Sequence, residues 1–197
     1  MNKALAIALM AGMSSQVVAA QAADPAGITV EALQDGLLSI MRAGSSAGQS
    51  GRARLIAPVI DRTFDIPLMT RLAVGPSWTG IAAPDRTSLV SAFRDMTIAE
   101  YARNFDDFSG ERFTIAPQVT TRGSDKLVRT TLASPGSDPE SLNYRLRQSG
   151  GQWKIIDVYY RNSISQLATR RSDFAAVLKK GGAKALIRHL EQLAAKP

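Results

Sequence analysis

The stretch LNYRLRQSGGQWKIIDVYY, from Leu142 to Tyr160, decides the fold. Its first six residues alternate apolar and polar side chains, which is the two-residue period of a strand with one buried face. Ser149-Gly150-Gly151 then predicts a hairpin turn, and Trp153 to Tyr160 is almost continuously apolar. An apolar run of this kind favours a central strand that is covered on both faces. The stretch therefore predicts two adjacent strands of a sheet.

Two further strands are expected just before this hairpin. Apolar residues alternate between Phe113 and Thr121, and Pro117 inside that run indicates a sheet edge or a bulge. Leu127 to Ala133 forms the next strand, and Ser134-Pro135-Gly136-Ser137 after it is typical of a turn. Four successive strands with short connections predict a strongly twisted, antiparallel, four-stranded meander.

Helical spacing precedes the sheet. A helix is expected from Glu31 to Met41, and the Gly- and Ser-rich stretch from Ala43 to Gly51 predicts a loop. Arg52 to Ile60 predicts a short helix that is interrupted at Pro58, because proline lacks the N–H that a helix interior needs.

Two more helices are expected before the sheet. One begins around Pro67 and ends at Gly75-Pro76. Proline is tolerated in the first turn because N–H groups there have no hydrogen-bond partner within the helix. The other begins at Pro84 and is closed by Gly110. Its apolar stripe contains Leu89, Phe93, Met96, Tyr101, Phe105 and Phe108.

The helical period returns after the sheet. One stretch runs from Ile164 to Leu178 and another from Ala183 to Leu193, with Gly181-Gly182 between them. The order of helices, sheet and helices predicts an α+β domain, with the sheet packed against N- and C-terminal helices.

The first residues predict export. Lys3 gives a positive start, Ala4 to Met13 is a short apolar run, and Ala20-Gln21-Ala22 fits the cleavage pattern of a secretory signal. The run is too short to span a bilayer, which takes about 20 apolar residues. We therefore expect residues 1–23 to be a signal peptide and residues 24–197 to form one domain in the periplasm.

Positive charge is concentrated near the C-terminus. From Asp24 to Tyr160 there are 15 basic and 15 acidic residues, whereas from Arg161 to Pro197 eight basic residues face only Asp173 and Glu191. This asymmetry indicates an anionic partner, such as lipid headgroups or an acidic protein, and export argues against nucleic acid. A solvated basic helix face explains the same pattern.

The sequence offers few groups for catalysis. His189 is the only histidine and cysteine is absent, which removes a thiol nucleophile, a disulfide scaffold and thiolate zinc ligands. Asp106 and Asp107 would point about 100° apart on a helix and do not share a site. An α+β enzyme that uses Asp157 or Tyr159 as acid or base in a cavity is one alternative. We expect no enzyme, no metal and no cofactor.

A set of segments, taken in order, covers nearly the whole chain after residue 23. The segments are Phe64-Asp65 with Met69, Val74-Gly75-Pro76-Ser77-Trp78, Phe93, Tyr101, Phe108-Ser109-Gly110, Trp153-Lys154-Ile155-Ile156-Asp157-Val158, Ile164-Ser165, Arg171-Ser172-Asp173-Phe174, Leu186-Ile187 and His189-Leu190. In order and spacing they resemble the toluene-tolerance or Mla-type family of periplasmic phospholipid-binding proteins.

Two segments look more like one branch of that family. Pro67 to Trp78 and Leu167 to Phe174 are similar to the hopanoid-biosynthesis-associated (HpnM-type) members. Arg170 stands where many members have tyrosine, and Tyr160-Arg161-Asn162 replaces a Glu-Gly-like turn. These departures bear on ligand choice and partner docking.

The resemblance implies a lipid carrier with an internal apolar pocket between the sheet and the helices. The pocket would hold the tails of a hopanoid or phospholipid, and the carrier, expected as a monomer, would shuttle it between membrane-bound donor and acceptor proteins. The residues expected to line the pocket are Met69, Leu72, Phe93, Tyr101, Phe105, Val119, Leu132, Tyr144, Leu146, Ile155 and Val158. Their periodicity alone is also that of a closed core.

The basic C-terminal helices are the expected docking surface. Lys179, Lys180, Lys184 and Arg188 would face a membrane or a partner protein. The alternative is a periplasmic adaptor with a solid core and no lipid, which binds an acidic partner through these same helices.

Overall fold

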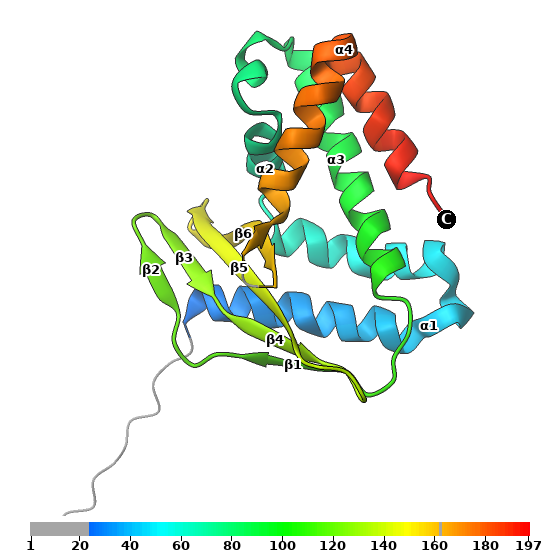
Figure 1. Cartoon of the computed structure of the whole chain (residues 1–197), viewed down its shortest axis with the longest axis vertical. Helices are drawn as coiled ribbons and strands as arrows, with labels where there is room; N and C mark the ends of the chain where they lie inside the picture. Colours follow the sequence, from blue (N-terminus) through cyan, green and yellow to red (C-terminus); the bar gives the residue numbers. More distant parts are fainter. Residues whose placement is uncertain (1–23, 162) are drawn as a thin grey trace, which may run out of the picture.

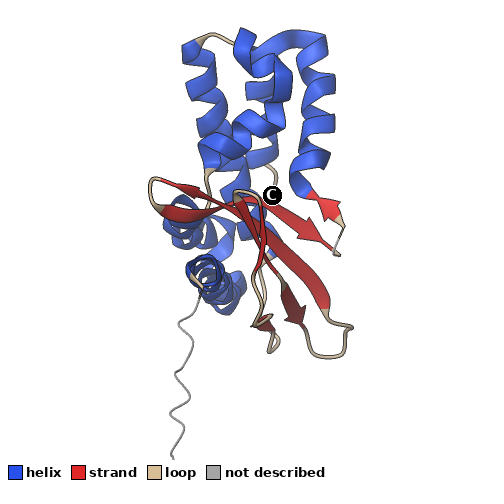
Figure 2. Cartoon of the chain, turned by 90° about the vertical axis from the view of Figure 1, so that its left-hand side faces the viewer, coloured by secondary structure: helices blue, strands red, loops and turns tan. Residues whose placement is uncertain are grey.

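The chain folds into a twisted sheet with helices along one face and at one end (Figures 1 and 2). The computed structural model describes residues 24–161 and 163–197, so the expected signal peptide lies outside the described residues. The helices are α1 (Pro25–Thr63), α2 (Ile66–Val74), the 3-10 helix η1 (Gly75–Gly80), α3 (Ala83–Asn104) and α4 (Gln166–Ala194). The strands are β1 (Arg112–Ile115), β2 (Thr120–Arg122), β3 (Asp125–Val128), β4 (Thr130–Ala133), β5 (Glu140–Ser149), β6 (Gln152–Tyr160) and β7 (Ile164–Ser165).

The helix labelled α1 consists of two limbs joined by a turn. The backbone leaves helical geometry at Gly44 and Gly48, where φ is 57° and 60°. The limbs then pack so closely that a Cβ on Gly36 would lie 2.8 Å from Val59. The expected break in the helix is confirmed. It is shorter than the loop predicted from Ala43 to Gly51, because only Gly44 and Gly48 leave helical geometry.

Two expected helix boundaries are wrong. The second limb of α1 continues through Pro58 to Thr63 because Pro58 is exposed, so water can bind the carbonyl that loses its N–H partner. α3 ends at Asn104 instead of Gly110. The carboxylate of Asp107 is unfavourable at a helix C-terminus and instead accepts a hydrogen bond from the N–H of Phe108 at 2.8 Å.

Within the described residues the sheet has seven strands, so the expectation of four strands is wrong in number. Each of the first two expected strands is divided in two, the first around Pro117 and the second at Arg129. The N–H of Ala116 donates to the carbonyl of Arg129 at 2.9 Å, which places the two interruptions side by side. Proline cannot extend the ladder, and both strands bend there. The short β7 pairs with β6 and completes the sheet.

All the strand pairs are antiparallel, so the expected direction of the sheet is confirmed. β5 pairs with β4 near its start, with β3 further along, and with β6 over its length. A bulge lies between Arg145 and Leu146. Tyr144 and Leu146 are buried in the core, whereas Arg145 and Arg147 belong to the outer face of the sheet.

α1 packs along the inner face of the sheet, where Leu33, Leu37, Val128 and Ile155 form part of the core. α2, α3 and α4 stand together at one end of the sheet (Figure 2). α4 bends at Gly182, where φ is 64°, as the Gly-Gly pair predicts, and its second limb returns toward the turn of α1 (Figure 1). Within residues 24–161 and 163–197, no helix combines the length and hydropathy that crossing a membrane requires.

An ion pair between Asp61 and Arg94 links α1 to α3 and makes stability depend on pH. The guanidinium donates to both carboxylate oxygens at 2.6 and 2.7 Å, which lowers the pKa of Asp61. A lowered pKa stabilises the fold above the ordinary aspartate value of about 3.9, and this stability disappears as pH falls through the lowered pKa. We expect Arg94→Ala to cost below about 1 kcal/mol at pH 7, because the pair is exposed, and nothing near pH 2. Urea unfolding at both pH values measures this, and equal losses at both would contradict it.

Candidate functional site

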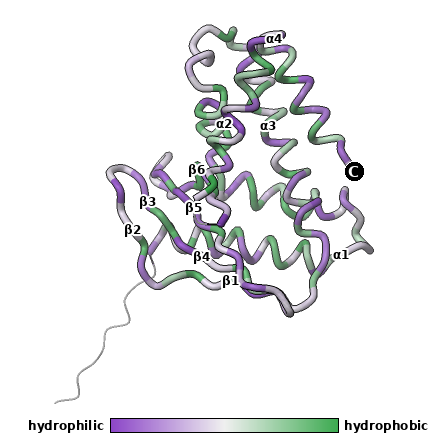
Figure 3. The backbone as a smooth tube through the Cα atoms, in the orientation of Figure 1, coloured by the Kyte–Doolittle hydropathy of each residue, from purple (hydrophilic) through white to green (hydrophobic). Residues whose placement is uncertain are grey.

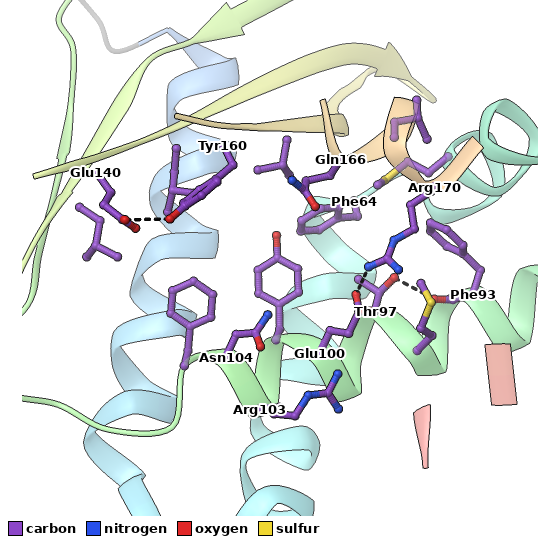
Figure 4. A pocket seen from close by; sticks show the side chains of 18 residues that line it. Phe64, Phe93, Thr97, Glu100, Arg103, Asn104, Glu140, Tyr160, Gln166 and Arg170 are labelled. Atoms are coloured by element: carbon purple, nitrogen blue, oxygen red, sulfur yellow. Dashed lines mark hydrogen bonds and ion pairs between the residues drawn. The ribbon is translucent and has the colours of Figure 1, made fainter. Parts of the chain in front are cut away.

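A mostly apolar pocket of about 480 Å³ opens between the sheet and helices α3 and α4. Its size is within the range of about 300–1,000 Å³ that is typical of ligand pockets. The lining residues are Phe64, Met69, Phe93, Met96, Thr97, Glu100, Tyr101, Arg103, Asn104, Phe105, Leu132, Glu140, Leu142, Val158, Tyr160, Gln166, Leu167 and Arg170. Figure 4 shows helix and sheet side chains gathered around one space.

Aromatic rings form a continuous part of the wall. The ring of Tyr101 stacks on that of Phe105 at a centroid distance of 5.7 Å, and Phe64 meets Tyr101 edge to face at the same distance. Phe93, also in the wall, contacts Phe174 behind it at 6.1 Å. Because these rings pack against one another, one side of the pocket is a mainly apolar aromatic wall.

Tyr101 also brings a hydroxyl group to the pocket. Burial raises the pKa of Tyr101 well above its usual value, and the nearby Tyr144 and Glu100 add to the rise. Burial likewise raises the pKa of Tyr144. Neither hydroxyl has a hydrogen-bond partner among residues 24–161 and 163–197. Tyr101 is therefore a neutral phenol that can hydrogen-bond a polar group of a ligand.

The lining contains two acidic residues, Glu100 and Glu140, and two basic residues, Arg103 and Arg170. Arg170 of α4 donates to the carboxylate of Glu100 on α3. Across the pocket, the hydroxyl of Tyr160 donates to Glu140 at 2.7 Å (Figure 4), and Arg161 is 3.3 Å from the same oxygen. Each carboxylate has a cationic partner, and the two acidic and two basic lining residues leave the pocket with little net charge.

Six of the eleven residues expected to line a pocket do so: Met69, Phe93, Tyr101, Phe105, Leu132 and Val158. The other five do not line it: Leu72, Val119, Tyr144, Leu146 and Ile155. Tyr144 and Leu146 share a strand face with Leu142, which does line the pocket. They lie further along β5 and are closed into the core, as is Ile155. Leu72 and Val119 are half-buried against that core from outside the pocket.

Several residues that line the pocket were not predicted from the sequence. Met96 belongs to the apolar stripe of α3, and Leu142 to the alternating pattern of β5, so periodicity could have found both. Glu100, Gln166 and Arg170 carry no such signal, because a polar residue at a pocket mouth follows the same spacing as one on a solvated helix face.

The groups proposed for an enzyme do not meet in this pocket. Asp157 is buried and accepts hydrogen bonds from the hydroxyl of Ser165 at 2.7 Å and the N–H of Leu167 at 3.1 Å, so it holds the start of α4. Tyr159 lines a different hollow on the outer face of the sheet. The single histidine, His189, is half-buried on the second limb of α4. In the described part of the chain, no group of three histidine or acidic side chains is placed to hold a metal ion.

The expected docking residues surround the bend of α4. Lys179, Lys180, Lys184 and Arg188 are all exposed and form no ion pair within the described residues. The bend lies at the end of the molecule away from the sheet (Figure 1). The lysines therefore lie away from the pocket wall that the sheet forms.

Loss of the Glu100–Arg170 pair should destabilise the pocket wall. The two side chains are 20% and 24% exposed, so Arg170→Ala leaves a largely buried carboxylate without its cation. We expect a loss of about 1–3 kcal/mol in the free energy of unfolding, measured in urea. The double variant Glu100→Gln/Arg170→Ala should recover part of the loss. Equal losses in the single and double variants would contradict a favourable pair.

Together, the fold and the pocket define a small α+β protein with a ligand-sized cavity between its sheet and its helices. The chain belongs to the MlaC protein family, whose model matches residues 31–192. Among solved structures it is similar to a phospholipid-binding protein from Ralstonia solanacearum that was solved in complex with a phospholipid. The TM-score is 0.71 at 24% identity, over 86% of this chain and 97% of the other, which shows a shared fold. No curated protein sequence matches the chain significantly.

Proposed function

We propose that the protein is a periplasmic carrier, not an enzyme, that holds the tails of a lipid in its pocket and transports it between membranes. The observation that carries this proposal is the mostly apolar pocket between the sheet and helices α3 and α4. Membership of the MlaC family supports it, and so does the likeness to a structure that contains a phospholipid. The adaptor alternative predicts a solid core, and the pocket counts against it.

We further propose that residues 1–23 direct export and are removed, and that residues 24–197 act as one monomeric lipid-binding domain. Burial of about 500 Å² of lipid hydrocarbon would contribute about 12 kcal/mol before association and ordering costs, which reduce the net gain substantially. The pocket residues proposed to contact the tails are Met69, Phe93, Tyr101, Phe105, Leu132 and Val158.

The cargo is proposed to be a phospholipid or a hopanoid. The likeness of Pro67–Trp78 and Leu167–Phe174 to the HpnM-type branch supports a hopanoid. The phospholipid in the similar structure from Ralstonia solanacearum supports a phospholipid. The near-neutral lining suits the apolar part of either molecule, because hydrocarbon tails and rings need no hydrogen-bonding or ionic partners.

Transfer between vesicles tests the carrier function. Donor vesicles carry a fluorescent phospholipid and a quencher, acceptor vesicles carry neither, and purified residues 24–197 are added at catalytic amounts. We expect the rate of fluorescence recovery to rise in proportion to protein concentration. A rate that stays at the spontaneous value at every concentration, with folded protein, would contradict transport.

Charge reversal at the bend of α4 should weaken transfer through docking. In Lys179→Glu/Lys180→Glu/Lys184→Glu the three exposed side chains change sign without losing a buried contact. We expect transfer to or from anionic vesicles to slow about tenfold at low salt, and the difference to shrink at high salt. The unfolding temperature should fall only slightly, because two glutamates then lie at the exposed C-terminal end of the first limb of α4. Transfer at the natural rate would exclude this surface.

A further inference from the structure

A second hollow, of about 460 Å³, lies on the outer face of the sheet. Asn143, Arg145 and Tyr159 are among its lining residues and alternate along their strands with Leu142, Val158 and Tyr160, which line the pocket. The two spaces therefore lie back to back on the same strands. The full lining of the hollow is Arg122, Asp125, Lys126, Leu127, Arg129, Asn143, Arg145 and Tyr159.

The hollow has an excess of positive charge. Its single carboxylate, Asp125, accepts hydrogen bonds from Arg147 at 2.6 and 3.0 Å, which lowers the pKa of Asp125. Lys126 is neutralised by Asp24 at 2.6 Å. Arg122 and Arg129 are exposed and have no carboxylate partner in residues 24–161 and 163–197. Figure 3 shows the tip of the β2–β3 hairpin, which carries Arg122, as hydrophilic.

Arg145 adds a donor that the protein itself does not satisfy. Its Nε is buried and makes no hydrogen bond within the described residues. The nearest carboxylate oxygen, on Asp125, is 3.7 Å away, too far for a hydrogen bond. Asp125 is already bound by Arg147, so it does not satisfy this donor. A hydrogen-bond acceptor on a bound ligand would satisfy the Nε–H of Arg145.

We infer that this hollow binds a phosphate group. Phosphate oxygens match the planar fork of arginine, and three arginines from β2, the β3–β4 junction and β5 surround the hollow. A concave site with a buried N–H donor favours a compact oxyanion over a flat, extended partner. The site is separate from the lipid pocket and does not depend on the proposed function. The phosphate comes either from a soluble ester or from a lipid headgroup.

Titration of purified residues 24–197 with two probes tests this site. The first probe is inorganic phosphate, followed by amide chemical shifts, and the second is phosphatidylglycerol in phosphatidylcholine vesicles, followed by co-sedimentation. The test variant is Arg122→Ala/Arg129→Ala. The matched control is Arg54→Ala/Arg62→Ala, which removes the same charge from exposed positions on α1. Arg145→Lys keeps the charge but removes Nε.

We expect saturable binding that weakens about tenfold in the test variant, weakens severalfold in Arg145→Lys, and is unchanged in the control. Binding of inorganic phosphate alone assigns the site to a soluble ester. Vesicle binding that weakens in the test variant assigns it to a headgroup, because binding through the bend of α4 would survive these substitutions. Both results support the site. Equal weakening in the test variant and the control, or no saturable binding of either probe, would overturn it. Circular dichroism checks that each variant is folded.

Discussion

Val158→Trp is expected to weaken lipid binding strongly while leaving the protein folded. Val158 is half-buried on β6 and lines the pocket, opposite the aromatic residues of α3. An indole in place of the isopropyl group would occupy the space in which the proposed lipid tails lie. We expect lipid affinity to fall about 100-fold, which corresponds to about 2.7 kcal/mol. Because the added ring enters an open space, the free energy of unfolding should change by less than about 1 kcal/mol, unlike overpacking of a closed core.

Leu55→Trp is the matched control for this substitution. Leu55 lies on α1, is 49% exposed and is not part of the pocket lining. The same ring should leave affinity for a fluorescent lipid unchanged there. If Val158→Trp binds lipid as the natural protein does, or if Leu55→Trp loses binding equally, the pocket is not the binding site.

Arg52→Met should cause the largest loss of stability. Arg52 is 6% exposed, and its guanidinium donates to the carbonyl of Ala102 at 2.8 Å and to that of Gly44 at 2.7 Å. Both carbonyls lie at the C-terminal ends of helical segments, where the helix dipole is negative and favours a cation. Methionine fills similar space but leaves both carbonyls without this donor. We expect a loss of about 3–5 kcal/mol in the free energy of unfolding, because a buried charged hydrogen-bond network is removed.

Urea unfolding measures this loss, with Arg54→Met as the control. Arg54 is two residues away on the same limb of α1 and is exposed, so its substitution should cost below about 0.5 kcal/mol. Similar midpoints for Arg52→Met and the natural protein would show that the turn of α1 and the end of α3 are held together by other contacts.

Local sequence patterns predict the sheet well and its interruptions poorly. The alternation of β5, the apolar run of β6 and the turn between them follow from side-chain periodicity, which the strand geometry requires. The two preceding strands are interrupted side by side, where the N–H of Ala116 meets the carbonyl of Arg129. That contact joins residues far apart in sequence, so no local pattern contains it.

The extent of the pocket, too, could not be predicted from local sequence patterns. Periodicity identifies which face of β5 points inward, and Leu142, Tyr144 and Leu146 all lie on that face. It does not reveal where along the strand the helices close over the sheet and where they leave a cavity. That boundary depends on the positions of α1 and α3, and it separates Leu142 in the pocket from Tyr144 and Leu146 in the core. The polar residues at the mouth are found only once α3 and α4 are placed together.

Native mass spectrometry of the protein isolated from its own cells tests the central claim most directly. Residues 24–197 should carry one lipid per chain, and collisional release followed by accurate mass should identify it as a phospholipid or a hopanoid. Val158→Trp, isolated in parallel, should appear without lipid. A natural protein that is folded and carries no lipid, and that takes up none from vesicles of either class, would contradict the account.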